Sequence, residues 1–461
     1  MSNENVWVRT KDAPLLPPPA SEVGITGWLW RNIFSSMSNF TSIGAAVQSV
    51  AMIALTIVIL YVFVNGALSL IDFAFIQSVW SDEDEVKRLA CATVLQGGAL
   101  PAEWYGACWP FIAAKSKLLI YGKYEVSEVW RVNIVYLVGA LGLIWVLYEA
   151  MPYRKWGGVF MLTVFPVGSF ILLTGGNIDV EFSTLVFWAV GAAVFLAIGF
   201  AGAKGMAGQV LEGFSSVFLG LGALFATVLV LAAIFAIDFG LEWVETDDWG
   251  GLLVTLVVAI TGIAASLPLG IVLALGRRSQ LPTIRMICVV FIEFWRGVPL
   301  ITVLFMSSVM LPLFLPEGTE FNKLLRALIG VALFSAAYMA EVIRGGLQAI
   351  PKGQFEGASA LGLNFGQSMQ LIILPQALVL VIPGIVNTFI GLFKDTTLVL
   401  IIGLFDLLGQ MQSTFTDSSW STPVQSMTGY MVAASIFWIF CFSMSRYSMF
   451  MENKLHRGHK R

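Results

Sequence analysis

The chain has 461 residues, of which 57% are hydrophobic and only 12% are charged. Soluble domains carry about 25% charged residues, so this composition excludes an ordinary soluble globular protein. The formal net charge of -3 says little by itself, but no basic run is long enough to indicate nucleic-acid binding.

A polar segment comes first, residues 1–46, and it contains Pro14, Pro17, Pro18 and Pro19. The first apolar stretch begins only after it, which is too late and too long for a cleaved secretion signal. We interpret 1–46 as a cytoplasmic N-terminal extension with an amphipathic piece around residues 28–40.

Apolar segments long enough to cross a bilayer then follow one another along the chain. A spanning helix needs about 20 mostly apolar residues, and strand-like alternation with period two is absent, which leaves a helical bundle as the solution in lipid. The sequence therefore predicts an all-α polytopic membrane protein with about ten spans. The expected spans are 48–71, 133–150, 157–175, 182–202, 214–238, 251–275, 290–313, 325–343, 378–402 and 428–450.

The spans divide into two regions. The first five, within 47–245, are nearly free of motifs and carry one long outer insertion at 72–132. The last five, within 250–450, carry every recognisable motif, and a basic tail follows at 451–461. No second copy of these motifs occurs in the first half, unlike the repeats of many secondary transporters.

The outer insertion contains Cys91 and Cys108, with 16 residues between them. In an oxidising compartment a disulfide between them is plausible, and two unpaired thiols are the alternative. Cys288 and Cys441 lie in or near expected spans and are interpreted as packing residues.

Basic residues predict the orientation of the chain. With both termini in the cytoplasm, the inner segments hold more Lys and Arg than the outer ones, and the outer ones gather acidic residues, as the positive-inside rule requires. This orientation places the loop 344–377 in the cytoplasm without reference to its motif. The inner basic residues are Arg9, Lys11, Arg31, Arg154, Lys155, Lys204, Arg277, Arg278, Arg285, Arg344, Lys352, Arg446, Lys454, Arg457, Lys460 and Arg461.

The loop itself has the spacing E-G-A-x3-G-x9-I-x-L-P over residues 356–375. Gly362 would join two short amphipathic helices, because glycine adopts backbone angles that other residues resist, and Pro375 would mark the start of the next span. Apolar side chains would then cover a groove on a soluble partner, with Glu356 at the rim. The apolar side chains expected to do so are Phe355, Leu361, Leu363 and Phe365. The alternative is an interfacial helix lying on lipid, which would be richer in Lys and Arg.

This pattern resembles the cytoplasmic coupling loop of ABC importer permeases of the polar amino acid uptake family. The phrase FIEFWRGVPLITVLF, with Glu293, Arg296, Gly297, Pro299 and Leu300, belongs to the same resemblance, which covers about residues 250–450. Gly357 stands where the commonest form of the loop has a second alanine. The extra N-terminal spans and the insertion resemble the larger permeases of general L-amino acid importers.

The resemblance implies a five-helix permease core and an inner-membrane location in a bacterium. It also implies partners: a second, related permease subunit, two ATP-binding cassette subunits, and a periplasmic binding protein that delivers an amino acid. The residues expected at the ATPase-coupling interface are Glu356, Gly357, Ala358, Leu361, Gly362, Leu363, Ile372, Leu374 and Pro375.

Charged residues within spans are candidates for the translocation path, because a charge in lipid is costly and tends to mark a pathway or a partner. Lys394 and Asp395, with Asn387, Thr396 and Thr397, are one group, although adjacent residues point about 100° apart around a helix. Neutralising groups on neighbouring helices is the alternative role for them.

Two further pairs share a helix face. Glu293 and Arg296 are three residues apart, as are Glu341 and Arg344, so the members of each pair could bind each other. For both pairs we expect a structural bridge at a helix end, within the helix or to a neighbouring one. Contact of Glu293 and Arg296 with substrate is the less favoured interpretation.

Several classes of function are excluded by what the sequence lacks. It has no G-x4-G-K-[ST] phosphate loop, so ATP hydrolysis would have to come from a partner. Its only histidines, His456 and His459, lie in the tail, so we expect no metal site, no cofactor and no bond chemistry. The runner-up, a secondary transporter of small polar solutes driven by an ion gradient, would leave residues 356–375 unexplained. A scaffold or assembly factor is a third class, and it would show no substrate-dependent phenotype.

Overall fold

A computed structural model describes Gly24 and residues 43–81, 87–204, 209–314, 322–420 and 422–457. Apart from Gly24 and residues 43–46, the expected N-terminal extension lies outside the described residues, as do its amphipathic piece and the end of the basic tail.

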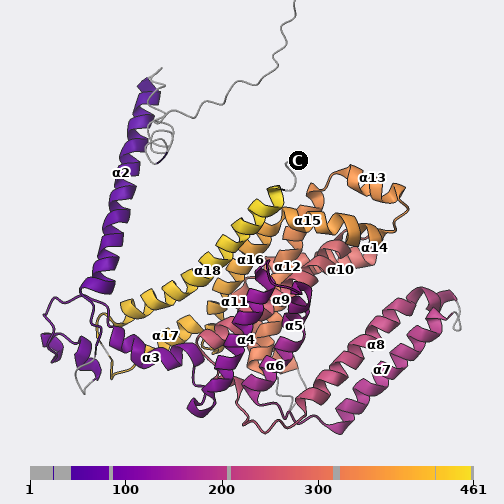
Figure 1. The fold of residues 1–461 in the computed structure, drawn as a ribbon, viewed down its shortest axis with the longest axis horizontal. Coiled ribbons are helices and arrows are strands. Elements are labelled where there is room, and N and C mark those ends of the chain that lie inside the picture. The colour runs from indigo at the N-terminus through magenta and orange to yellow at the C-terminus, as the bar shows by residue number, and fades with distance from the viewer. Residues whose placement is uncertain are drawn as a thin grey trace, which may run out of the picture. The chain divides into compact units, whose positions relative to one another are not determined.

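The described chain is built from helices, with only isolated β-bridges between loops (Figure 1). This confirms the all-α fold class. The principal helices are α2 (Ile43–Ile71), α3 (Trp109–Tyr121), α4 (Val129–Leu147), α5 (Arg154–Leu162), α6 (Val164–Thr174), α7 (Phe182–Ala203), α8 (Gln209–Phe235), α9 (Leu252–Arg277), α10 (Pro282–Gly297), α11 (Leu300–Phe305), α12 (Lys323–Ala349), α13 (Lys352–Ala360), α14 (Phe365–Ser368), α15 (Leu374–Leu380), α16 (Ile382–Asp395), α17 (Leu407–Thr414) and α18 (Gln425–Arg457).

Among the described residues, eight helices are long and apolar enough to cross a membrane, and two bent pairs bring the total to ten if each pair is one span. The two bent pairs lie in the expected spans 157–175 and 290–313. α5 and α6 meet at 41° because Pro166 has no N–H with which to continue the helical bonding. α10 and the segment Leu300–Phe314 meet at 101°, since Val298, held extended (φ -110°, ψ 131°) before Pro299, cannot be helical.

Two compact units make up the chain. The smaller one comprises residues 1–82 and 89–108. In it, a disulfide joins Cys91 to Cys108, with their Cα atoms 5.9 Å apart. The N–H groups of Val79 and Ala107 donate to the carbonyls of Ala107 and Phe73 at 2.9 and 2.8 Å. Closing a loop of this length stabilises a fold by about 3 kcal/mol.

The larger unit contains the helical bundle, whose centre is the packing of α9 along α12. Two clusters of buried side chains form its core. One includes Leu253, Val258, Leu304, Leu324 and Val399. The other lies towards the opposite ends of α9 and α12.

The second cluster supports the loop that follows α12. It contains Ile292, Met339, Ile343, Leu347 and Ile373, all of them 0–1% exposed. α12 and α15 approach closely here: a Cβ on Gly346 would lie 2.6 Å from the carbonyl oxygen of Ala377. The absence of a side chain at Gly346 therefore sets the distance between these two helices.

At the other end of the bundle, α17 is fixed to the start of α9. Asp406 caps α17, accepting from the N–H groups of Leu408 and Gly409 at 3.2 and 2.9 Å. The Leu407 N–H donates to the hydroxyl of Thr255 at 2.9 Å. Burial raises the pKa of Asp406 to about 6, against the lowering effect of the two N–H donors.

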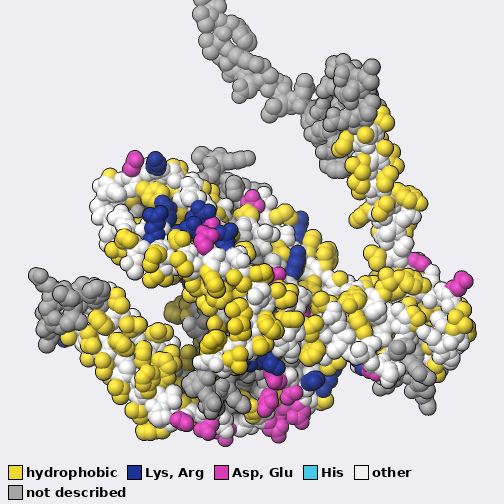
Figure 2. All heavy atoms as spheres, turned by 180° about the vertical axis from the view of Figure 1, so that it is seen from behind, with side chains coloured by type: hydrophobic (Ala, Val, Ile, Leu, Met, Phe, Trp, Pro, Cys, Tyr) yellow, Lys and Arg dark blue, Asp and Glu magenta, His cyan; other side chains and the backbone are white. Residues whose placement is uncertain are grey.

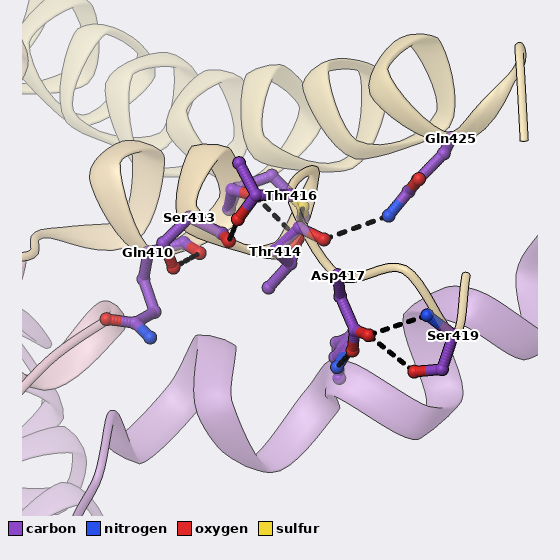
Figure 3. A network of polar contacts seen from close by, with 9 residues as sticks. Gln410, Ser413, Thr414, Thr416, Asp417, Ser419 and Gln425 are labelled. Carbon is purple, nitrogen blue, oxygen red and sulfur yellow. Dashed lines mark hydrogen bonds and ion pairs between the residues drawn. The ribbon is translucent and has the colours of Figure 1, made fainter. Parts of the chain in front are cut away.

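The segment after α17 carries a second carboxylate, Asp417, whose pKa is lowered rather than raised. Asp417 accepts from Lys115 on α3 and from the hydroxyl and N–H of Ser419 (Figure 3). The hydrogen bond from Lys115 is the main reason that the pKa of Asp417 is lowered to about 2.

We predict that Gly346→Ala destabilises the protein by about 1–3 kcal/mol, because the new methyl group overpacks the contact with α15. Gly345→Ala is the matched control, since a Cβ on Gly345 meets nothing within 4 Å and gains up to about 1 kcal/mol in helix propensity. Thermal unfolding in detergent checks the pair. Equal melting temperatures for the two variants would contradict the close approach of α12 and α15.

We also predict a pH dependence from Asp406. Its raised pKa means that its contribution to stability is complete below about pH 4 and is lost as the pH rises to about 6, at no more than about 1.4 kcal/mol per pH unit. Asp406→Asn keeps the helix cap and removes this pH dependence of stability. The difference in melting temperature between the variant and the original protein should therefore increase in favour of the variant from pH 4 to pH 7.

Asp417→Asn is the control for that experiment. The contribution of Asp417 is lost only as the pH falls from about 4 towards 2, so this variant should show a constant offset between pH 4 and 7. A constant offset for Asp406→Asn as well would contradict the assignment of the slope to Asp406.

Candidate functional site

The loop 350–375 extends beyond the ends of α12 and α15 (Figure 1). α13 ends in a tight turn, in which Gly362 has φ +71°. The N–H of Leu363 donates to Ala358 and that of Gly362 donates to Ser359, at 3.2 and 3.0 Å. This is the Schellman closure, in which a left-handed glycine lets the last carbonyls of a helix find donors. The glycine spacing of the sequence thus has a direct structural cause.

A second local device starts the next helix. Asn364 caps α14 by accepting from the Gln367 N–H at 2.9 Å, and the Gln367 side chain accepts from the Asn364 N–H at 3.1 Å. This reciprocal pair is a capping box. The elbow between α13 and α14 is therefore specified by its own sequence, independently of a partner.

The elbow is anchored to the bundle on both sides. Phe355 of α13 packs against the second core cluster, and the Arg278 guanidinium lies 5.2 Å from its ring centroid. Gln376 of α15 donates to Gln354 of α13 at 3.2 Å, and Ala358 is 1% exposed. A displacement of α13 would therefore act on the ends of α9 and α15.

Three apolar side chains are left on the surface of the elbow. Leu361 is 75% exposed, Phe365 60% and Leu371 66%, while Phe355 and Leu363 are half-buried. Of the four side chains that were expected to cover a partner, the structure therefore exposes only Leu361 and Phe365, and it adds Leu371.

Leu371 was missed because Met369–Ile373 forms a π-helical turn, which shifts the face on which a side chain emerges. The other residues expected at this surface differ in exposure. Glu356, Gly357 and Pro375 are exposed, whereas Ile372 and Leu374 are half-buried against the second cluster.

An ion-pair cluster lies next to the elbow, centred on Glu341 of α12. Its carboxylate accepts from Arg277 of α9 at 2.6 Å and from Arg344 at 2.7 Å. Arg296 of α10 lies 3.7 Å away. Glu341 is only 15% exposed, so this one carboxylate joins three helices.

A structural bridge is present for both pairs: Glu341 and Arg344 pair within α12, whereas Glu293 and Arg296 pair with neighbouring helices and not with each other. Glu293 pairs instead with Arg277 at 3.1 Å. The cause is the bend after Gly297, which turns α10 across the end of α9, where Arg277 reaches it. Both residues thus take part in a structural cluster.

The candidate path residues on α16 separate into two environments. Asn387 and Lys394 are exposed and, seven residues apart, share one helix face. Thr396 is 1% exposed and donates to the carbonyl of Phe393 at 2.8 Å, so it lines no open surface of this chain. Asp395 is half-buried. The open polar face is therefore formed by Asn387 and Lys394.

Within the described residues, no three His, Cys, Asp or Glu side chains are grouped so that they could hold a metal ion. What the geometry provides is a rigid apolar elbow, an ion-pair cluster beside it, and a polar stripe on one span.

Comparison with known proteins gives consistent matches. The family model for the binding-protein-dependent transport system inner membrane component matches residues 266–456. The inner membrane amino-acid ABC transporter permease protein YhdY of Escherichia coli (strain K12) is 41% identical over 444 residues, 96% of each chain.

A second relative extends over the whole length. The glutamate/glutamine/aspartate/asparagine transport system permease protein BztC of Rhodobacter capsulatus is 39% identical over 461 residues, covering 99% of this chain and 100% of that protein. A crystal structure of an amino acid ABC transporter with histidines is 28% identical and covers 44% of this chain and 92% of its own, at a TM-score of 0.39. The chain belongs to the amino-acid ABC transporter permeases, a family of binding-protein-dependent inner membrane components.

Proposed function

We propose that this permease couples amino acid import to ATP through the elbow formed by α13 and α14. The observation that carries the proposal is the exposure of Leu361, Phe365 and Leu371 on a turn whose backbone is fixed by its own hydrogen bonds. A rigid apolar surface of this kind is suited to a groove on a soluble partner.

The partners are two ATP-binding cassette subunits below the elbow, a second permease subunit beside this one, and a periplasmic binding protein. Both termini are cytoplasmic in this account. The distribution of charge supports that orientation, since a dense group of Lys and Arg lies at one end of the bundle (Figure 2). The segment before α9, at the end of the bundle opposite to the elbow, is acidic instead. Its acidic residues are Glu242, Glu245, Asp247 and Asp248.

Transmission follows from how the elbow is anchored. The ATP-bound partner must contact one conformation of the elbow better than another, because a ligand shifts an equilibrium only by its differential affinity. α13 is joined to α9 through Arg278 and to α15 through Gln376. The ends of these helices would thus move with the elbow.

The polar stripe on α16 is proposed to face the substrate path next to the second permease. A charged side chain on a span costs about 2.5–3.5 kcal/mol when it faces lipid, and Lys394 has no ion pair among the described residues. An adjoining subunit or an aqueous path would remove that cost, and Lys394 would then attract the carboxylate of an amino acid. The amino acids named for the second relative, glutamate, glutamine, aspartate and asparagine, support polar amino acids as the cargo.

We predict that Leu361→Glu combined with Phe365→Glu abolishes ATP-dependent uptake in reconstituted vesicles, because two carboxylates would have to be desolvated in the partner's groove. The ATPase subunits should also fail to copurify. Leu95→Glu is the matched control: this leucine is 81% exposed on the disulfide-bonded segment, and its replacement should leave uptake unchanged. Normal uptake by the double variant would contradict the proposed role of the elbow.

Uptake by the purified protein without ATP, driven by a proton or sodium gradient, would instead establish the secondary-transporter alternative. The double variant would then transport as well as the unmodified protein.

A further inference from the structure

A hollow of about 400 Å³ opens between the end of α9, the start of α10 and the end of α12. It is lined by four arginines with Val289 and Gln348. We call this cavity the arginine hollow. Its arginines are Arg277, Arg278, Arg285 and Arg344. Neither the elbow surface nor the stripe on α16 includes this hollow.

The charges around the hollow do not balance. Its acidic neighbours are Glu341 and Glu293, which pair with Arg277, Arg344 and Arg296. Arg278 donates to the carbonyl of Leu347 at 3.2 Å and lies against Phe355, and neither contact neutralises it. Arg285 is exposed and belongs to no ion pair in the described part of the chain. The hollow therefore keeps an excess of positive charge.

Guanidinium groups are suited to a phosphate, because their N–H donors match its oxygens two at a time. Four such groups from three helices converge on one concavity. The ligand chemistry that they favour is a phosphate-bearing anion.

α10 indicates the source of that phosphate. Its outward face carries Met286, Ile287, Val290 and Phe294, which are 57–61% exposed, while Arg285 and Val289 of the same helix line the hollow. An apolar helix face beside a basic pocket is typical of the membrane surface, where the pocket binds a lipid headgroup and the apolar face lies against acyl chains. A free phosphate has no apolar part that could contact this face.

We propose that the arginine hollow binds the phosphate of an anionic phospholipid, with the lipid's acyl chains along the Met286–Phe294 face of α10. The bound lipid offsets the repulsion among the arginines and holds α10 against the ends of α9 and α12. The site goes beyond the transport function and does not depend on it, because its occupancy is measurable without uptake.

Binding to the full chain in detergent tests the proposal, with phosphatidylglycerol, phosphatidylcholine and inorganic phosphate as three separate probes. Native mass spectrometry should detect retained phosphatidylglycerol, and the melting temperature should rise with that lipid alone. Arg285→Gln should weaken phosphatidylglycerol binding about tenfold, which is the effect of losing one charge-assisted interaction. Arg446→Gln, at an exposed arginine of α18, is the matched control and should leave binding unchanged.

A second variant separates lipid from free anion. Ile287→Ser with Val290→Ser should weaken phosphatidylglycerol binding while leaving the hollow intact. Equal stabilisation by inorganic phosphate, with no effect of this variant, would overturn the lipid assignment. Equal binding of phosphatidylglycerol and phosphatidylcholine would overturn it too. A third result would also overturn the lipid assignment. If Arg285→Gln loses the copurifying ATPase subunits without any change in lipid binding, the hollow is a protein contact.

Discussion

The carboxylate of Glu341 is the interaction on which the elbow-bearing end of the bundle depends. It accepts from Arg277 and Arg344 at 2.6 and 2.7 Å and has Arg296 at 3.7 Å. Exposed ion pairs contribute about 0–1 kcal/mol, but this carboxylate is 15% exposed and shared by three cations. Its removal would leave the arginines facing one another, and losing one partner of a buried pair costs about 3–5 kcal/mol. This group therefore joins the ends of α9, α10 and α12, beside the apolar packing of the second core cluster.

The elbow and the arginine hollow take their positions from the same cluster. Arg278 follows Arg277 directly and lies against Phe355 of the elbow, and Arg344 belongs to both the cluster and the hollow. A partner that moves α13 and a lipid that fills the hollow would therefore act on the same three helix ends. The bundle's other end is fixed separately, through Asp406 and Thr255.

Local features of this fold could be predicted from the sequence, and tertiary ones could not. The turn at Gly362 and the cap at Asn364 depend on neighbouring residues alone, so the spacing of the loop was informative. The partner of Glu293 depends on where α10 lies, which is set by the 101° bend. The sequence Gly297-Val298-Pro299 did carry a signal for that bend, in the restriction that proline places on the residue before it. No comparable signal separates buried Thr396 from exposed Lys394, because burial is decided by α11 and α18 packing around α16 and its continuation.

The cluster at Glu341 holds together the helix ends on which the elbow is anchored. The most direct measurement is the number of amino acid molecules imported per ATP hydrolysed by the reconstituted complex carrying Glu341→Gln. Glu149→Gln, which breaks the pair between Glu149 and Lys454 of α18, is the control. We expect the Glu341→Gln complex to assemble and to hydrolyse ATP but to import about tenfold less per ATP, as for the loss of a typical coupling free energy. An unchanged ratio for Glu341→Gln would contradict it.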